Sequence, residues 1–232
     1  MNDQPKPTTL RIILQVLFFI ALVPLLPLLI SQKWGWWEAW LYAAINILGF
    51  ALSRYLMAQR HPDLITERAR MMQHDDAKSW DRRLSGLMGL LGIIIPVVAG
   101  LDALYGWSPV TSLPVKVLAL LLILTGHWLG SYALIVNRFF SGVVRIQSDR
   151  GHHVVSAGPY RWIRHPGYAG ALLTYAGTPF LLGALWTILP ALLVSAVLVI
   201  RTRLEDQTLQ DELEGYSDYA ASVRYRLLPG FW

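Results

Sequence analysis

The residues best suited to chemistry lie in one short segment, GPYRWIRHPGYAG, at positions 158–170. Pro166 suits the first turn of a helix, where a missing backbone donor costs nothing, and His165 would then lie near the cap. The free backbone amides of such a helix start, reinforced by Arg164, predict a binding site for a carboxylate or a phosphate.

The same segment contains Tyr160 and Tyr168. Their aromatic faces attract a cation such as a sulfonium, and their hydroxyl groups can fix its orientation. The alternative is that the basic residues only reach toward a membrane interface and that the tyrosines belong to its aromatic belt. The tripeptide RHP also occurs at 60–62 without the flanking tyrosines and glycines, so on its own it is weak evidence for a ligand site.

A second candidate segment is RTRLEDQTLQDELEGYSDYAASVRYRLLPGFW, at 201–232. Glu205 and Asp206 lie near its start, where a carboxylate could hydrogen-bond a ribose diol or pair with Arg201 or Arg203. The alternative is a solvated, charged helix face.

The composition indicates that a bilayer surrounds the elements that position these segments. Of the 232 residues, 54% are hydrophobic and only 15% are charged, which is too apolar for a soluble domain of this length. The absence of cysteine excludes disulfides, thiolate zinc sites and cysteine nucleophiles. Membrane topology accounts for the net charge of +5, so we expect neither a nucleic-acid partner nor a metal.

Apolar runs predict an all-α integral membrane protein. Four runs have the length of a membrane-spanning helix: Leu10 to Ile30, Trp36 to Met57, Leu84 to Tyr105, and Leu113 to Val136. The last run, Gly167 to Ile200, would form a helix of about 50 Å, whereas the hydrocarbon core is about 30 Å thick. We therefore expect a helical hairpin that turns at Gly183, and about six transmembrane helices in total.

The distribution of Lys and Arg predicts the orientation of these spans. With the N-terminus inside, the outer loops hold only Lys33. The inner segments hold the excess: Lys6 and Arg11, six residues between 58 and 83, five between 137 and 164, and four from 201 onward. Such an excess is typical of cytoplasmic loops. Both termini, the polar loop before the hairpin and the tail after it are therefore expected on the cytoplasmic side, together with any pocket that the loop and the tail form.

Small residues recur along the third and fourth predicted spans, and they predict faces on which helix backbones approach closely. They are Gly86, Gly89, Gly92, Gly126 and Gly130.

The polar loop before the hairpin contains two short alternating stretches, Val143 to Gln147 and His152 to Ser156. Together with Asn137 and Arg145, they predict a lid formed by a hairpin of strands over the site.

Taken together, the segment at 158–170, the helical hairpin and the tail resemble the isoprenylcysteine carboxyl methyltransferase family, including its many prokaryotic members. The resemblance covers about the last hundred residues, and HPDLITERAR at 61–70 also looks like an inner-loop segment of prokaryotic relatives. It implies an S-adenosylmethionine-dependent methyltransferase. The cofactor site would be built from the inner loop, the RHPGY segment and the tail, with a lipid-like substrate entering between helices from the bilayer.

The resemblance extends to individual residues. The family's Glu-Glu-x-x-Leu pattern appears at 205–209 with Asp206 as a departure, which shortens the second carboxylate by one methylene. The resemblance implies the following cofactor-binding residues: Gly158, Tyr160, Arg164, His165, Pro166, Tyr168, Glu205 and Leu209.

The sequence leaves the methyl acceptor open among a carboxylate, a thiol and an amine. A carboxylate acceptor is already ionised at neutral pH and needs no general base, and Arg201 or Arg203 could orient it. An amine or a thiol would need a deprotonating group, for which Glu205 and His165 are the candidates.

The chain is thus expected to consist of a four-helix transmembrane region, residues 1–136, and a cofactor-binding and catalytic region, residues 137–232, in a prokaryotic inner membrane. Two other classes compete with this interpretation. A small transporter would also use six spans and polar residues such as His127, but it predicts paired broken helices at mid-membrane. A non-catalytic membrane scaffold predicts no cofactor binding.

Overall fold

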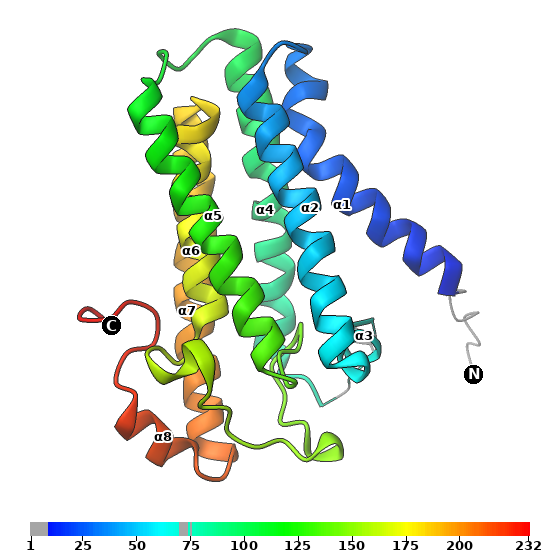
Figure 1. Ribbon diagram of the computed structural model, residues 1–232, viewed down its shortest axis with the longest axis vertical. Coiled ribbons are helices and arrows are strands. Elements are labelled where there is room, and N and C mark those ends of the chain that lie inside the picture. Colours follow the sequence, from blue (N-terminus) through cyan, green and yellow to red (C-terminus); the bar gives the residue numbers. More distant parts are fainter. Residues whose placement is uncertain (1–8, 70–73, 75) are drawn as a thin grey trace.

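The computed structural model of the chain describes residues 9–69, 74 and 76–232, and within these residues it contains helices and no strand. The predicted all-α fold is confirmed. Six long helices follow one another along the chain (Figure 1): α1 (Thr9–Ser31), α2 (Trp37–Arg60), α4 (Ser79–Tyr105), α5 (Leu113–Val136), α6 (Pro166–Leu182) and α7 (Ile188–Glu212). The short elements are α3 (Pro62–Ala69), α8 (Tyr216–Ser222) and the 3-10 helices η2 (Ser148–Arg150), η3 (Gly158–Arg161) and η4 (Leu185–Thr187).

Four of the described helices are long and apolar enough to cross a bilayer: Trp37–Arg60, Ser79–Tyr105, Leu113–Val136 and Leu185–Glu212. Together they make the chain an integral membrane protein. Helix α6 has 17 residues, and Lys6 and the side chain of Arg11 lie outside what the structure describes. The count of six spans and the cytoplasmic location of both termini therefore stay predictions.

The turn of the predicted hairpin lies at Gly183, as expected. Gly183 has a φ of 62° and ends α6, a left-handed conformation that glycine adopts without a steric penalty. The buried carboxylate of Asp102, at the end of α4, accepts hydrogen bonds from the hydroxyl of Ser108 at 2.6 Å and from the backbone amide of Trp186 at 3.1 Å. These bonds fasten the α6–α7 turn to α4.

Helix α6 is positioned by close packing against α5 (Figure 1). A Cβ added at Gly126 would lie 2.4 Å from the backbone oxygen of Gly170, so only glycine fits at this crossing. By contrast, a Cβ at Gly86, Gly89, Gly92 or Gly130 would meet nothing within 4 Å. A Cβ added at Gly170 would lie 2.9 Å from the backbone nitrogen of Gly130. The prediction of close backbone contact is therefore confirmed for Gly126 and Gly130, and no such contact is found at Gly86, Gly89 or Gly92.

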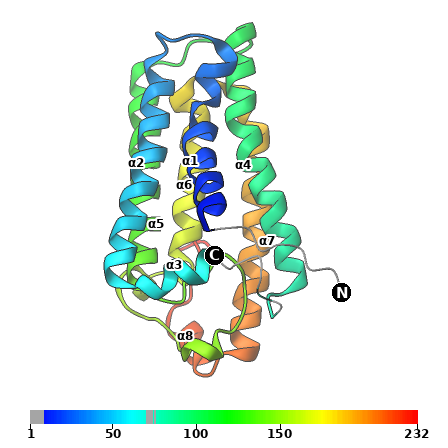
Figure 2. The ribbon, with the colours of Figure 1, turned by 90° about the vertical axis from the view of Figure 1, so that its right-hand side faces the viewer.

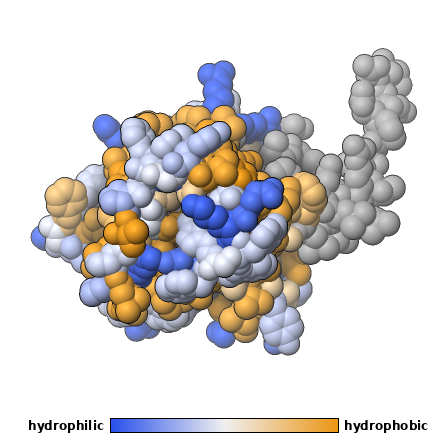
Figure 3. Space-filling view, turned by 90° about the horizontal axis from the view of Figure 1, so that it is seen from above, coloured by the Kyte–Doolittle hydropathy of each residue, from blue (hydrophilic) through white to orange (hydrophobic). Residues whose placement is uncertain are grey.

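The two ends of the bundle differ in character. One end, which we call the site end, gathers α3, α8 and the polar segment 137–165 (Figures 1 and 2). The opposite end presents a mixture of hydrophobic and hydrophilic residues (Figure 3). Exposed tryptophans at this end, Trp34, Trp37, Trp107 and Trp186, are typical of a membrane–water interface.

Candidate active site

A cavity of about 790 Å³, counting its open mouth, lies at the site end. Its walls come from residues 137–145 and 152–155, from the start of α6, and from residues of α7 and α8. Two sequence segments that are far apart in the chain therefore meet at one cavity.

Seven of the ten residues predicted to form the site line this cavity: Tyr160, Arg164, His165, Tyr168, Arg201, Glu205 and Leu209. Gly158, Pro166 and Arg203 do not. Gly158 has a φ of 57° and faces the side chains of Val136 and Tyr132, so its role is in the backbone turn. Pro166 begins α6 and is buried, as the helix-start prediction required, whereas the side chain of Arg203 is exposed.

Asp206 is the centre of a buried ionic cluster. Its carboxylate is fully buried and accepts two hydrogen bonds from Arg164, at 2.7 and 2.8 Å. The Nε2 of His165 lies 3.2 Å from the same carboxylate, and Tyr216 and Arg226 donate to it at 3.0 and 2.8 Å. Several charge-assisted bonds to one carboxylate fix α7, α8 and the tail against the start of α6.

The prediction that Arg164 reinforces an anion site at the start of α6 is wrong in its geometry. The guanidinium donates to Asp206 through Nε and Nη2, and through Nη1 to the backbone oxygens of Val223 and Arg224 at 2.7 and 3.0 Å. All three nitrogens are thus engaged within the protein. Burial opposes the charge, but Asp206 raises the pKa of Arg164 above its ordinary value, so the residue holds the tail as a permanent cation.

Glu205 lies next to this cluster and is linked to two other predicted residues. The hydroxyl of Tyr168 donates to Glu205 at 2.5 Å and accepts a hydrogen bond from Arg201. Arg201 also lies over the ring of Tyr168, 5.1 Å from its centroid, while the ring of His165 stacks parallel to Tyr168 at 5.7 Å. The ring of Tyr168 therefore already interacts with a cation of the protein itself.

The carboxylate that pairs with Arg201 comes from a residue that the sequence reasoning missed. Arg201 Nε donates to Asp81 at 2.6 Å, and the other oxygen of Asp81 accepts the backbone amide of Val144 at 2.8 Å. The expected pairing of Arg201 or Arg203 with the carboxylates one turn away is not what the structure has. Asp81 lies on α4, 120 residues from Arg201, and nothing in the local sequence marks this partnership.

Comparisons with known proteins agree with this placement. The sequence model of the isoprenylcysteine carboxyl methyltransferase (ICMT) family matches residues 118–211. We call these residues, 118–211, the ICMT family region. This family region contains most of the residues that line the cavity, from Asn137 to Leu209, whereas Asp81 and α8 lie outside it.

Similarity to individual curated proteins is confined to a shorter stretch. The chain is 33% identical over 69 residues to the "Probable protein-S-isoprenylcysteine O-methyltransferase" of Oryza sativa subsp. indica, which covers 29% of this chain and 36% of the plant protein; the subsp. japonica protein gives the same values. It is 39% identical over 62 residues to "Uncharacterized protein YpbQ" of Bacillus subtilis (strain 168), covering 26% and 37% of the two chains. The matches therefore span about a third of the length of these relatives.

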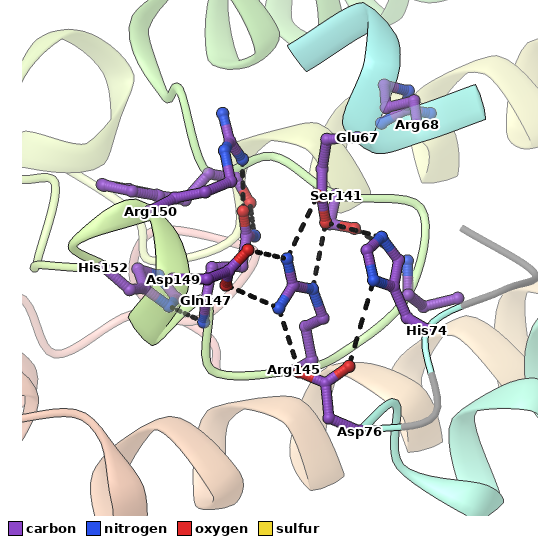
Figure 4. Close-up of polar contacts among 12 residues, drawn as sticks. Glu67, Arg68, His74, Asp76, Ser141, Arg145, Gln147, Asp149, Arg150 and His152 are labelled. Carbon is purple, nitrogen blue, oxygen red and sulfur yellow. Dashed lines mark hydrogen bonds and ion pairs between the residues drawn. The ribbon is translucent and has the colours of Figure 1, made fainter. Parts of the chain in front are cut away.

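Outside the ICMT family region, α3 fixes the segment that covers the cavity. Arg145 is buried and donates hydrogen bonds to both carboxylate oxygens of Glu67, at 3.0 and 3.1 Å. It also donates to Asp76 and Asp149, each at 2.9 Å (Figure 4). Burial opposes the charge, but these carboxylates raise the pKa of Arg145 above its ordinary value, and Arg145 in turn lowers the pKa of Asp149.

The predicted lid of two strands is wrong in its secondary structure. Between 137 and 165, all of which the structure describes, the chain forms turns and the 3-10 helices η2 and η3 but no strand. The segment nevertheless covers the cavity, since Val143 to Arg145 and His152 to Val155 line it. Its shape comes from side-chain bonds such as those of Arg145, which replace a ladder of backbone hydrogen bonds.

Two histidines of this segment enclose an aromatic ring at the cavity wall. The ring of Phe139 lies 4.6 Å from that of His152 and 4.8 Å from that of His153. Burial, followed by the nearby His153, Arg145 and Arg150, lowers the pKa of His152 to about 4. His152 is therefore neutral at physiological pH and contributes apolar surface to the cavity.

Proposed function

We propose that this chain is an S-adenosylmethionine-dependent membrane methyltransferase that acts on a lipophilic acceptor. One observation carries the proposal. Glu205 is the only carboxylate among the described residues that line the cavity, and it lies beside Tyr168 and Arg201 within the ICMT family region. The names of the two plant relatives, which describe them as probable protein-S-isoprenylcysteine O-methyltransferases, are consistent with this assignment.

The chemistry of the cavity fits the cofactor. S-adenosylmethionine carries hydroxyl and ammonium groups, from which Glu205 would accept hydrogen bonds. Its adenine ring would pack against the aromatic wall of the cavity, which consists of Phe139, Tyr160, Tyr216 and Tyr219. When bound, it supplies a methyl group on a positively charged sulfur. The described residues contain no group of three or more His, Asp or Glu side chains that could hold a metal ion, and methyl transfer of this kind requires none.

The residues around Glu205 would mainly position the reactants. Arg201 is held in place by Asp81, so its guanidinium is preorganised to orient an acidic acceptor. Arg203, the other predicted candidate, is exposed, which leaves this role to Arg201. The segment held by Arg145 would exclude water from the reacting groups.

An amine or thiol acceptor would need a group that removes its proton. His165 is poorly suited, because its Nε2 already lies against the carboxylate of Asp206. Glu205 is half-buried in the cavity and, among the residues that the structure describes, accepts one hydrogen bond, from Tyr168. We therefore assign the role of general base to Glu205 for such acceptors, whereas a carboxylate acceptor would need none.

We further propose that the site end faces the cytoplasm of a prokaryotic cell, with the protein in the inner membrane. Arg60, Arg138, Arg150 and Arg161 lie at this end, and Lys33 lies at the opposite end. An excess of basic residues marks the cytoplasmic side of membrane proteins.

Isothermal titration of the purified, detergent-solubilised chain with S-adenosylhomocysteine tests the proposal. Hydrogen bonds to a charged group contribute about 1.5 to 3 kcal/mol, so Glu205→Gln should weaken binding by about 10- to 150-fold. Glu214→Gln is the matched control, because Glu214 is exposed and lies outside the cavity. Absence of binding by the native chain, or equal affinities of all three proteins, would contradict the proposal.

A further inference from the structure

Two arginines near the cavity have no carboxylate partner among the described residues. Arg54 of α2 lies over the ring of Phe50 at 4.6 Å, and its Nη1 is buried without a hydrogen-bond partner. Arg68 of α3 donates to the backbone oxygen of Phe140 at 2.9 Å and lies over the Phe140 ring at 5.7 Å. Neither guanidinium forms an ion pair with any acid that the structure describes.

The position of Arg54 differs from that of an ordinary interfacial arginine. Arg54 lies six residues before the end of α2, which places it about 9 Å inside the helix end. A snorkelling side chain would carry its guanidinium out to water, but Nη1 of Arg54 has almost no exposed surface. Arg54 as a whole is partly buried, but a buried guanidinium nitrogen without a hydrogen-bond partner is costly and, within a membrane helix, points to a ligand.

Phe140 lies between Arg68 and the cavity. Its ring lines the cavity and packs against the start of α6, where a Cβ at Gly167 would approach it to 2.6 Å. Arg68 lies on the ring and is close enough to Tyr168 and Arg201 to interact with both electrostatically. Arg68 therefore borders the same reacting region as Glu205, from the side of α3, and Arg54 on α2 is close enough to Arg68 to interact with it electrostatically.

The region between α2, α3 and α7 is strongly electropositive. Three guanidinium groups, of Arg54, Arg68 and Arg201, converge there, and Asp81 neutralises only Arg201. Burial, together with the positive charge of Arg54, lowers the pKa of Arg68 to about 9. Uncompensated positive charge in a desolvated region favours an anion strongly.

We propose that Arg54 and Arg68 bind a carboxylate or phosphate head group of the lipophilic acceptor. The fork of a guanidinium matches both anions, and two forks side by side would select an acidic amphiphile over a neutral one. This inference rests on the proposed function, because it identifies the bound amphiphile as the methyl acceptor. Binding of the acidic head group itself does not require the cofactor.

The course of α1 is consistent with access from the bilayer. Its described packing contacts lie toward the opposite end, where Leu25 and Leu28 join the core and Ile30 packs against Gly100. Toward the site end, α1 leans away from α2 and α4 (Figures 1 and 2). The acidic head group of a lipid would thus reach the arginines from the membrane and leave its chain in the bilayer.

Binding of chain-matched amphiphiles to the full-length protein in nanodiscs tests the inference. The probes are dodecanoate, dodecyl phosphate, the neutral dodecanol, and inorganic phosphate to represent a free anion. We expect the native protein to bind at least one of the acidic amphiphiles at least 10-fold more tightly than dodecanol, and inorganic phosphate much more weakly than the amphiphile. Arg54→Gln and Arg68→Gln should each reduce this preference about 10-fold.

Arg60→Gln is the matched control, because Arg60 is exposed at the end of the same helix. Arg54→Lys and Arg68→Lys, which keep the charge, should retain part of the preference and show that the fold is intact. Equal binding of acidic and neutral probes to the native protein, an equal loss in Arg60→Gln, or no loss in either glutamine variant would overturn the inference. Failure of S-adenosylhomocysteine to bind would instead count against the proposed function and leave the result with amphiphiles intact.

Discussion

Replacing Asp206 with Asn tests the buried cluster that holds the tail on the cavity. The substitution keeps the shape of the side chain and removes its charge. Arg164, which is 5% exposed, would then be left as a buried cation without its counter-ion. In addition, the new amide NH₂ group would face a donor nitrogen of Arg164 or Arg226, where a carboxylate oxygen of Asp206 now accepts a hydrogen bond.

The magnitude follows from the burial of both partners. Removing one partner of a buried ion pair costs about 3 to 5 kcal/mol, because the remaining charge stays desolvated. The carboxylate of Asp206 is fully buried, so solvent screening does not reduce this cost. We expect Asp206→Asn to lower the free energy of unfolding by an amount in this range.

Unfolding by sodium dodecyl sulfate in mixed micelles, followed by circular dichroism, measures this change. Limited trypsin digestion provides a local readout, since release of the tail would expose the bonds after Arg224 and Arg226. Asp211→Asn is the control, because Asp211 is exposed on the same helix.

A free energy of unfolding within about 0.5 kcal/mol of the native value, the range usual for surface substitutions, together with an unchanged digestion pattern, would refute the reasoning. It would mean that Arg164 is held by the backbone oxygens of Val223 and Arg224 alone.

Three further predictions concern packing, pH and the segment over the cavity. Gly126→Ala should destabilise the protein by about 1 to 3 kcal/mol through overpacking, because its Cβ would meet the Gly170 backbone; Gly130→Ala, with open space at the same test position, should leave the unfolding transition nearly unchanged. Folding lowers the pKa of His152 from 6.5 to about 4. Between these two pH values, the unfolded segment therefore binds a proton that the folded segment does not. The stability of the folded segment should therefore fall as the pH falls from about 6.5 to about 4. Hydrogen exchange of residues 137–155, corrected for intrinsic rates, measures this stability. His152→Gln should abolish the pH dependence, and His153→Gln should not. Arg145→Gln should leave the buried carboxylate of Glu67 with His74 in place of the guanidinium as its neighbour, increase trypsin cleavage after Arg150 and weaken S-adenosylhomocysteine binding; unchanged cleavage would show that the Arg145 cluster does not hold the segment.

Hydropathy and glycine patterns predicted the architecture well for physical reasons. Long apolar runs have few alternatives to membrane helices, and a run too long for one span had to turn, which it does at Gly183. The RHPGY segment predicted the start of α6, because the fixed backbone angle of proline suits the first position of a helix and its missing N–H is not needed there.

Pairings between distant residues could not be predicted in the same way. Asp206 looked like a weakened copy of a family glutamate, yet it joins Arg164, Tyr216 and Arg226, which approach only in the folded chain. Asp81 was overlooked, since its partner Arg201 is 120 residues away. Alternating residues at 143–147 suggested a strand, but the consecutive residues Val143, Val144 and Arg145 are all buried, so this segment packs against the protein on more than one side.

Photochemical cross-linking of methyl-labelled S-adenosylmethionine to the purified chain, followed by peptide mapping, tests the central claim most directly. It requires no knowledge of the acceptor. We expect the label in peptides from 137–168 and 201–219, competed by S-adenosylhomocysteine and strongly reduced in Glu205→Gln but not in Glu214→Gln. Label that is absent, that resists competition, or that lies in peptides of α1, α2 or α4 would contradict a cofactor site at this cavity.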